Sequence, residues 1–348
     1  EAPIFKEAQL MLRQWEQGDS EVVALWKKMN QWVYDGFDVT YKRLGVDFDS
    51  LYYESQTYLV GKEFIKTGLD SGVFYKKDDG SVWCDLTSDG LDEKIVLRAD
   101  GTAVYMTQDI GTAFKRYEDF GFDNMIYVTG SEQIYHFQTL FKILEKIGCN
   151  WSKKCSHLSY GMVDLPSGKM KSREGTVVDA DDLILKMRNE SLKLIKSSNK
   201  FDDFDKDEIH ELSKIVGDGA LKYFILKVDA KKNMLFNPAE SIDFNGNTGP
   251  FIQYTYARIQ SLIQKVEGEL ELHLDLSLID KEKEILKHLS TYPALVKTAG
   301  EQYSPALVAN YLYELVKIFN SFYQNVSVFG SKDQKLKSLR LLLCKAVA

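Results

Sequence analysis

Three short apolar runs, separated by segments of helical periodicity, constrain the fold more than any other feature. They lie at residues 95–97, 125–128 and 158–163, with helices predicted over 103–117 and 133–147. The order strand, helix, strand, helix, strand is that of a parallel sheet. Such sheets bind ligands beyond the carboxyl ends of their strands, so we expect the chemistry at residues 130–136 and 161–175.

The pattern changes on both sides of this unit. Residues 7–35 predict a helix or a helical pair, and residues 72–86 predict a hairpin. After residue 179 the pattern is mostly helical, with a loop cluster at 245–250 as an internal boundary. Helices are expected at 181–198, 207–227, 248–268, 280–299, 304–325 and from about 332 onward. The sequence therefore predicts an α/β unit followed by an all-α unit.

Composition narrows the class of protein. The 348 residues are 44% hydrophobic and 27% charged, and the net charge is −7, which still permits a nucleic-acid reader whose lysines cluster locally. No apolar run approaches the roughly 20 residues of a membrane span. The four cysteines form no CxxC pair, which indicates reduced thiols and a cytoplasmic protein. Cys149, Cys155 and His157 could share a metal ion, but their spacing fits no four-ligand site, so no metal site is predicted.

A basic loop follows the third predicted strand. Residues 167–176 combine two glycines with Lys169, Lys171 and Arg173. A flexible backbone with closely spaced cations suits a polyphosphate, whose charge must be neutralised during transfer. On composition alone, a solvated basic turn is an equally good interpretation.

The first predicted helix offers a candidate socket for a guanidinium group. Tyr105 and Asp109 are four residues apart, so they share a helix face. The carboxylate can accept a fork of N–H donors, and the ring can stack or form a hydrogen bond. On spacing alone, a surface acid beside a core tyrosine is the commoner arrangement.

Resemblance to a known family decides between these alternatives. The string Lys169-Met170-Lys171-Ser172-Arg173 resembles the second signature of class I aminoacyl-tRNA synthetases, and residues 161–178 closely resemble the arginine-specific branch. Residues 99–109 resemble the arginine pocket of that branch. The implied fold is the second half of a Rossmann-type catalytic domain followed by an anticodon-binding helical bundle. The implied activity is that of an arginine–tRNA ligase, which uses ATP with Mg²⁺, L-arginine and arginine tRNA. The resemblance also implies a monomer that does not bind a membrane.

The resemblance also assigns roles to single residues. Tyr105, Asp109 and Gln133 would bind arginine. The positions implied to bind ATP are Gly130, Glu132, His136, Gly161, Met162 and Val163. As a lone histidine, His136 would more often be a structural helix residue.

The catalytic loop departs from the family pattern at one position. Lys169, Lys171, Ser172 and Arg173 are the implied catalytic residues, but Ser172 stands where the family has its second lysine. The loop therefore offers no residue that is secure as the main phosphate lysine. The family's His-x-Gly-His signature does not occur in this sequence, so we expect the 348 residues alone to be inactive.

The helical tail carries a second resemblance. Asp218-Gly219-Ala220-Leu221-Lys222 resembles the Asp-Ala-Leu-Arg motif of the family's anticodon domain. Tyr254, Tyr256 and Arg258 would then stack on or bond to anticodon bases, although tyrosines that pack between helices are the alternative. A basic run that includes Arg188 and Lys193 could follow the tRNA backbone or form a solvated helix face.

These observations give four predicted regions and three hypotheses of function. The regions are an insertion at 1–95, the catalytic half-domain at 96–180, a helical linker at 181–245 and the anticodon-binding bundle at 246–348. In the first hypothesis the chain is the larger piece of an active arginine–tRNA ligase. In the second it is a tRNA-binding module without catalytic activity. In the third it is an unrelated adenylyl transferase. The last should show phosphate-binding glycines after a first strand, and this sequence has none.

Overall fold

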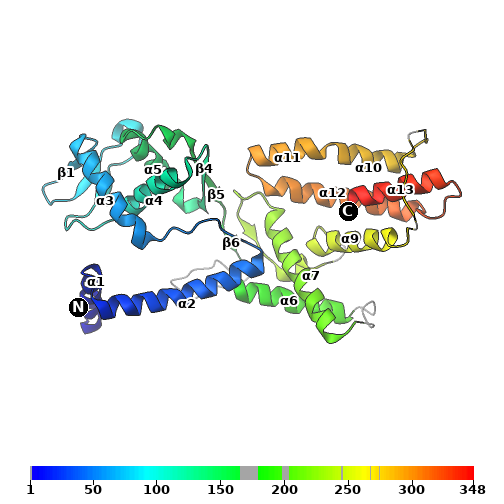
Figure 1. The fold of residues 1–348 in the computed structure, drawn as a ribbon, viewed down its shortest axis with the longest axis horizontal. Coiled ribbons are helices and arrows are strands. Elements are labelled where there is room, and N and C mark those ends of the chain that lie inside the picture. Colours follow the sequence, from blue (N-terminus) through cyan, green and yellow to red (C-terminus); the bar gives the residue numbers. More distant parts are fainter. Residues whose placement is uncertain (1, 165–178, 198–203, 244–245, 267, 274) are drawn as a thin grey trace. The chain divides into compact units, whose positions relative to one another are not determined.

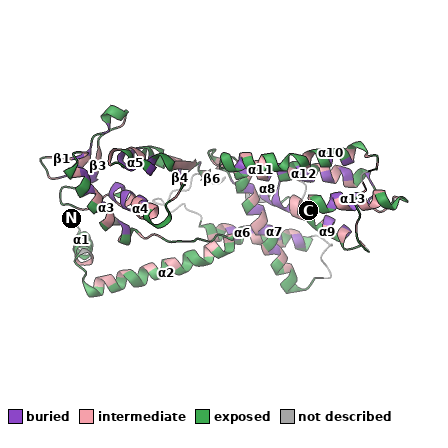
Figure 2. Ribbon diagram, turned by 45° about the horizontal axis from the view of Figure 1, so that its top comes forward, coloured by how far each residue is buried: buried purple, intermediate pink, exposed green. Residues whose placement is uncertain are grey.

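The computed structural model describes residues 2–164, 179–197, 204–243, 246–266, 268–273 and 275–348 (Figure 1). Residues 1–51 with 179–181 form one compact unit, and the other residues form a second. The first unit contains α1 (Pro3–Glu16) and α2 (Ser20–Leu44), which confirms the predicted helical pair. The Asp19 side chain caps α2, and Gly45 ends it in the left-handed conformation at φ 67°. Every described residue of α2 remains at least partly exposed (Figure 2).

The second unit begins with α3 (Glu54–Asp70) and a small antiparallel sheet. The predicted hairpin is confirmed as β1 (Phe74–Lys76) and β2 (Val82–Cys84). The strand β3 (Lys94–Leu97) pairs antiparallel with β2, so the prediction that it joins the parallel sheet is wrong. A three-residue apolar run contains no information about which neighbour it will pair with, because periodicity only identifies a strand.

The parallel part of the fold is a pair of strands packed against two helices. Its elements are α4 (Tyr105–Phe120), β4 (Met125–Gly130), α5 (Ile134–Lys146) and β5 (Cys155–Tyr160). The two strands run parallel, with Tyr127 opposite His157. Both helices bury one face in the same core as α3 and the hairpin, through residues such as Ile110 and Leu140.

The third predicted strand is interrupted at Gly161. A Cβ atom there would lie 2.4 Å from the backbone carbon and oxygen of Lys232. This close approach moves the chain away from β4, and β6 (Val163–Asp164) pairs with β7 (Met234–Leu235) instead. The expected single strand over 158–163 is therefore two short strands in different sheets.

The rest of the described chain is mostly helical, as predicted. The helices are α6 (Ala180–Ser197), α7 (Lys206–Leu226), α8 (Pro238–Ser241), α9 (Gly249–Ile263), α10 (Asp280–Ser290), α11 (Tyr292–Glu301), α12 (Pro305–Asn325) and α13 (Gln334–Val347). The helix expected over 280–299 is in fact α10 and α11. The break falls before Pro293, which lacks the N–H for a continuous helix but suits a first turn.

Two glycines allow α7 and α9 to cross closely. A Cβ atom on Gly249 would lie 2.6 Å from the carbonyl oxygen of Gly219, so only glycine fits there. The neighbouring motif residues Ala220 and Leu221 are buried, and Cα of Ala220 would lie 3.1 Å from the same Cβ atom. A separate core of the helical part includes Ile259, Phe319 and Phe322. None of the described helices combines the length and apolar character needed to cross a membrane.

Candidate functional site

The basic loop of the sequence analysis lies outside the described residues. This applies to Lys169, Lys171, Ser172 and Arg173, so their predicted catalytic role stays a prediction. The described part of the candidate site is therefore formed by the beginnings of α4 and α5 and by residues 161–163.

The beginning of α4 is fixed in place from its buried side. The fully buried Thr107 hydroxyl donates to the carbonyl oxygen of Val96 and accepts the N–H of Val104 at 3.0 Å. One turn further on, a Cβ atom on Gly111 would lie 2.2 Å from the carbonyl oxygen of Thr57 in α3. These contacts set which face of α4 points outward.

Tyr105 and Asp109 lie on the outward face of α4. Tyr105 is 76% exposed, and the Asp109 side chain is 37% exposed. A phenol ring and a carboxylate one turn apart on a rigid helix are available to a planar cation. The alternative of a core tyrosine is wrong for Tyr105, because its ring is among the most exposed large side chains.

The beginning of α5 supplies the neighbouring groups. After Gly130 the chain makes a 3₁₀ turn, Ser131–Gln133, and Gln133 occupies the N-cap position of α5, where its exposed side chain makes no capping hydrogen bond. One turn later, Nε2 of His136 lies 2.6 Å from Oδ2 of Asp109. This contact joins α4 to the first turn of α5, so it places Asp109 beside the segment that carries Gln133.

Gly130 and Glu132 form a compact bend at the end of β4. The Glu132 carboxylate folds back so that a Cβ atom on Gly130 would lie 2.5 Å from both of its oxygens. The contact is with the far end of a flexible, exposed side chain, so a larger residue at Gly130 would displace the Glu132 carboxylate from this position. An exposed acid held over a strand end can accept hydrogen bonds from hydroxyl groups.

The backbone at residues 161–163 is largely engaged within the protein. The N–H of Gly161 donates to Ala230 at 2.7 Å. The N–H of Met162 donates to Oδ1 of Asn233 at 2.7 Å, and its carbonyl oxygen accepts the N–H of Met234 at 2.9 Å. Asn233 was missed at the sequence level, because no local pattern marks an asparagine that bonds to a backbone 71 residues away.

Of the two cysteines considered for a metal site, Cys149 is buried and Cys155 is partly buried. Burial raises the pKa of Cys149 to about 12 and the pKa of Cys155 to about 11. His157 instead contacts the Thr129 hydroxyl at 2.8 Å, and burial lowers its pKa. In the part of the chain that the structure describes, no three His, Cys, Asp or Glu side chains form a group that could hold a metal ion.

The predicted tRNA-contacting residues on α9 differ in their surroundings. The tyrosines Tyr254 and Tyr256 are 38% and 52% exposed, so neither is a core residue. The Arg258 guanidinium lies between the rings of Tyr254 and Tyr323, 4.9 and 4.8 Å from their centroids, and bonds to Asn320. Arg258 therefore has a packing role within the bundle.

Arg188 corrects the interpretation of the basic run on α6. Its guanidinium makes two hydrogen bonds to the Asp218 carboxylate, at 2.8 and 2.6 Å, and both side chains are mostly buried. A residue in such a bidentate pair neither follows a tRNA backbone nor faces solvent freely. Asp218, the first residue of the Asp-Gly-Ala-Leu string, thus joins α7 to α6.

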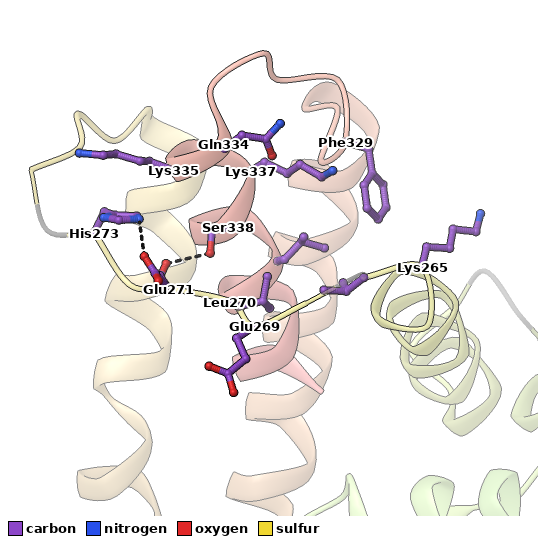
Figure 3. A pocket seen from close by; sticks show the side chains of 12 residues that line it. Lys265, Glu269, Leu270, Glu271, His273, Phe329, Gln334, Lys335, Lys337 and Ser338 are labelled. Atoms are coloured by element: carbon purple, nitrogen blue, oxygen red, sulfur yellow. Dashed lines mark hydrogen bonds and ion pairs between the residues drawn. The ribbon is translucent and has the colours of Figure 1, made fainter.

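The helical part contains a hollow of about 570 Å³ between residues 265–266 and 269–273 on one side and the start of α13 on the other (Figure 3). Lys337 lies 5.3 Å from the Phe329 ring centroid, and Lys335 pairs with Asp275 at 3.0 Å. Acids and bases are interspersed around this hollow, so its charge does not select an anion. The charged side chains that line it are Lys265, Glu269, Glu271, Lys335 and Lys337.

Comparison with known protein families gives two matches that together cover most of the chain. Residues 1–237 match the family model of the catalytic domain of class I tRNA synthetases (R), and residues 252–348 match that of the DALR anticodon binding domain. These matches confirm the predicted fold class of an α/β catalytic part followed by a helical anticodon-binding part.

Individual relatives agree with the family models. The chain is 59% identical to an arginine–tRNA ligase of Flavobacterium psychrophilum, over 100% of this chain and 58% of the relative. It is 56% identical to one of Porphyromonas gingivalis, over 99% of this chain and 59% of the relative. It thus spans somewhat more than half the length of these relatives.

Solved structures show the same fold at low sequence identity. The arginyl-tRNA synthetase of Plasmodium falciparum superposes with a TM-score of 0.82 at 22% identity, over 99% of this chain and 59% of that one. The Thermus thermophilus arginyl-tRNA synthetase gives 0.81 at 21% identity, over 96% and 64%.

Proposed function

The chain belongs to the class I tRNA synthetase family of the arginine branch, and from this premise we propose that it acts in arginine–tRNA ligation. It would supply the arginine pocket, part of the ATP site and the anticodon-binding bundle. The observation that carries this proposal is the partly exposed Asp109 carboxylate on α4, held beside the first turn of α5. A carboxylate flanked by a phenol and an amide matches the fork of donors on a guanidinium.

The reaction would proceed in two steps without a covalent enzyme intermediate. The carboxylate oxygen of arginine attacks the α-phosphorus of ATP, and the bond to pyrophosphate breaks. A ribose hydroxyl at the tRNA 3′ end then attacks the carbonyl carbon of the arginyl-adenylate, and AMP leaves. The protein contributes alignment of the reactants and stabilisation of the developing charge.

Arginine would be held through its side chain. Asp109 would accept the guanidinium N–H groups, Gln133 would read the same group from α5, and the Tyr105 ring would cover it. Because Tyr105 and Asp109 lie on a helix beginning that buried contacts fix in place, these two groups would be preorganised for arginine. Lysine, with a compact ammonium group, cannot make the same bidentate contact.

The nucleotide would lie beyond the strand ends. Glu132 would accept hydrogen bonds from the ribose hydroxyls, Gly130 would allow close approach, and residues 161–163 would pack against the adenine. Mg²⁺ would bind with the ATP phosphates and neutralise their charge. Lys169, Lys171, Ser172 and Arg173 would contact the phosphates during transfer.

The helical part would bind arginine tRNA through exposed aromatic side chains. Tyr254 and Tyr256 are suited to stack on unpaired anticodon bases, and Arg258 would hold Tyr254 in position from its other side. We further propose that the protein acts as a monomer in the cytoplasm.

Arginine-dependent exchange between pyrophosphate and ATP tests the proposal. A chimera would be assayed in which the Flavobacterium relative supplies the part of its length that this chain does not match. We expect exchange with arginine and none with lysine or citrulline. Failure of the folded chimera to exchange with arginine, with or without arginine tRNA, would contradict the proposed function.

A second candidate is a tRNA-binding module without activity. It is favoured by the match of residues 252–348 to a DALR anticodon binding domain. The 348-residue chain by itself should then shift arginine tRNA in a gel without supporting exchange. Robust exchange by this chain alone would exclude the inactive module.

A further inference from the structure

His136 contacts Asp109, and the sequence did not predict this contact. The two side chains come from different helices, and Nε2 lies 2.6 Å from Oδ2. The His136 side chain is only 19% exposed, whereas Asp109 is 37% exposed. The imidazole therefore lies behind the carboxylate, on its more protected side.

The chemistry of this contact fixes which group donates. An ionised carboxylate can only accept hydrogen bonds, so Nε2 of His136 carries the proton and donates to Oδ2. Each carboxylate oxygen can accept more than one hydrogen bond, so a bound cation can still reach Oδ1 and the remaining lone pair of Oδ2. The histidine therefore restricts rotation of the Asp109 carboxylate from one side. The acceptor positions on the other side stay free for a ligand.

We propose that His136 is a positioning residue for the arginine pocket: it fixes the rotamer of Asp109 so that the carboxylate presents a fixed edge to the guanidinium. This inference rests on the proposed function, since it assumes that Asp109 binds arginine. It places His136 on the amino-acid side of the site instead of the nucleotide side. The negative charge of Asp109 also disfavours a phosphate group next to the His136 imidazole, because the carboxylate would repel it.

The test uses the same chimera and compares two substitutions. His136→Leu removes the donor at similar size, and His136→Gln keeps an N–H donor near the position of Nε2. We expect the leucine variant to raise the KM for arginine about tenfold or more, which corresponds to the loss of one hydrogen bond to a charged group. The KM for ATP should stay within about twofold, and the glutamine variant should recover most of the arginine affinity.

A double-mutant cycle separates positioning from direct binding. In an Asp109→Ala background, His136→Leu should cause no further rise in the KM for arginine, because its only effect passes through the carboxylate. The matched control is His210→Leu, the same substitution at an exposed histidine of α7, which should leave both KM values unchanged.

A readout that needs no catalysis comes from nitrogen NMR of the imidazoles in the 348-residue chain. We expect His136 to be in the Nε2–H tautomer, and Asp109→Ala to change its Nε2 shift. A rise in the KM for ATP with His136→Leu, or an additive loss in the Asp109→Ala background, would overturn the inference. Because the parent chimera must first exchange with arginine, failure of the proposed function would be seen separately.

Discussion

A buried ion pair in the helical part leads to a sharp prediction about stability. Glu282 of α10 is fully buried, and the Arg340 side chain of α13 is 12% exposed. The Glu282 carboxylate accepts Nε of Arg340 at 2.8 Å and the N–H of Ile279 at 3.0 Å. Replacing Glu282 by leucine removes both acceptors and leaves a guanidinium without its counter-charge. Breaking a buried pair in this way costs about 3–5 kcal/mol of unfolding free energy.

The positions of the tryptophans allow this loss to be assigned to one part of the chain. All five tryptophans lie at or before Trp151, so their fluorescence does not report on the helical core around Phe319. Helical circular dichroism reports on both parts. In urea we expect Glu282→Leu to lower the midpoint of the major helical transition by about 2 M, assuming a slope of about 2 kcal/mol per molar. The tryptophan transition should move less, because Trp151 packs in a different hydrophobic core of the same compact unit.

Two further variants decide whether the ion pair is the cause. Glu282→Leu combined with Arg340→Met should recover most of the stability, because neither charge is then left alone in the core. Glu314→Leu removes an exposed partner of Lys317, in a pair 3.0 Å apart, and should cost less than about 0.5 kcal/mol. A loss with Glu282→Leu no larger than that with Glu314→Leu, or no recovery in the double variant, would refute the reasoning.

Three other predictions follow from the packing, the thiols and the exposed rings. Gly111→Ala places a methyl group 2.2 Å from the Thr57 carbonyl oxygen, so the tryptophan-detected unfolding free energy should fall by about 1–3 kcal/mol, and an unchanged value would argue against the close helix crossing. Burial raises the pKa of Cys344 to about 12, so the folded state keeps its proton above the pKa of an unfolded thiol; stability should fall as pH rises above about 9, and less so in Cys344→Ala. Tyr256→Ala should change the unfolding free energy by no more than about 0.5 kcal/mol but weaken binding of arginine tRNA in a filter assay by about 1–3 kcal/mol. Tyr292→Ala, at another exposed tyrosine, should leave tRNA binding unchanged.

Much of the local structure was predictable because its signals are local. The helices α6, α7 and α12 have apolar periodicity along their lengths, and the predicted bounds agree with the structure within one residue. The hairpin at 72–86 follows from a turn between two short apolar runs. The helix predicted over 280–299 failed only at Pro293, where a proline in a helical pattern permits either a kink or a new start.

Pairing between distant segments was not predictable. The apolar run at 95–97 identified β3 as a strand, but only the tertiary structure decided that it pairs with β2. In the same way, Arg188 reads as one cation of a basic run, yet the Asp218 carboxylate from the next helix accepts hydrogen bonds from its Nε and Nη2 atoms, which form one edge of the guanidinium. Charge alone cannot show whether a cation is already satisfied by a partner 30 residues away.

The sequence by itself determined the family and the face of α4 that carries Tyr105 and Asp109, because a spacing of four residues fixes a shared helix face. It also singled out Gln133 and His136, but as separate positions on a later helix. Only the tertiary structure decided that His136 lies 2.6 Å from Asp109. Their side chains meet because α4 and α5 pack on one core, and the distance between two helices depends on side-chain packing that no local pattern encodes.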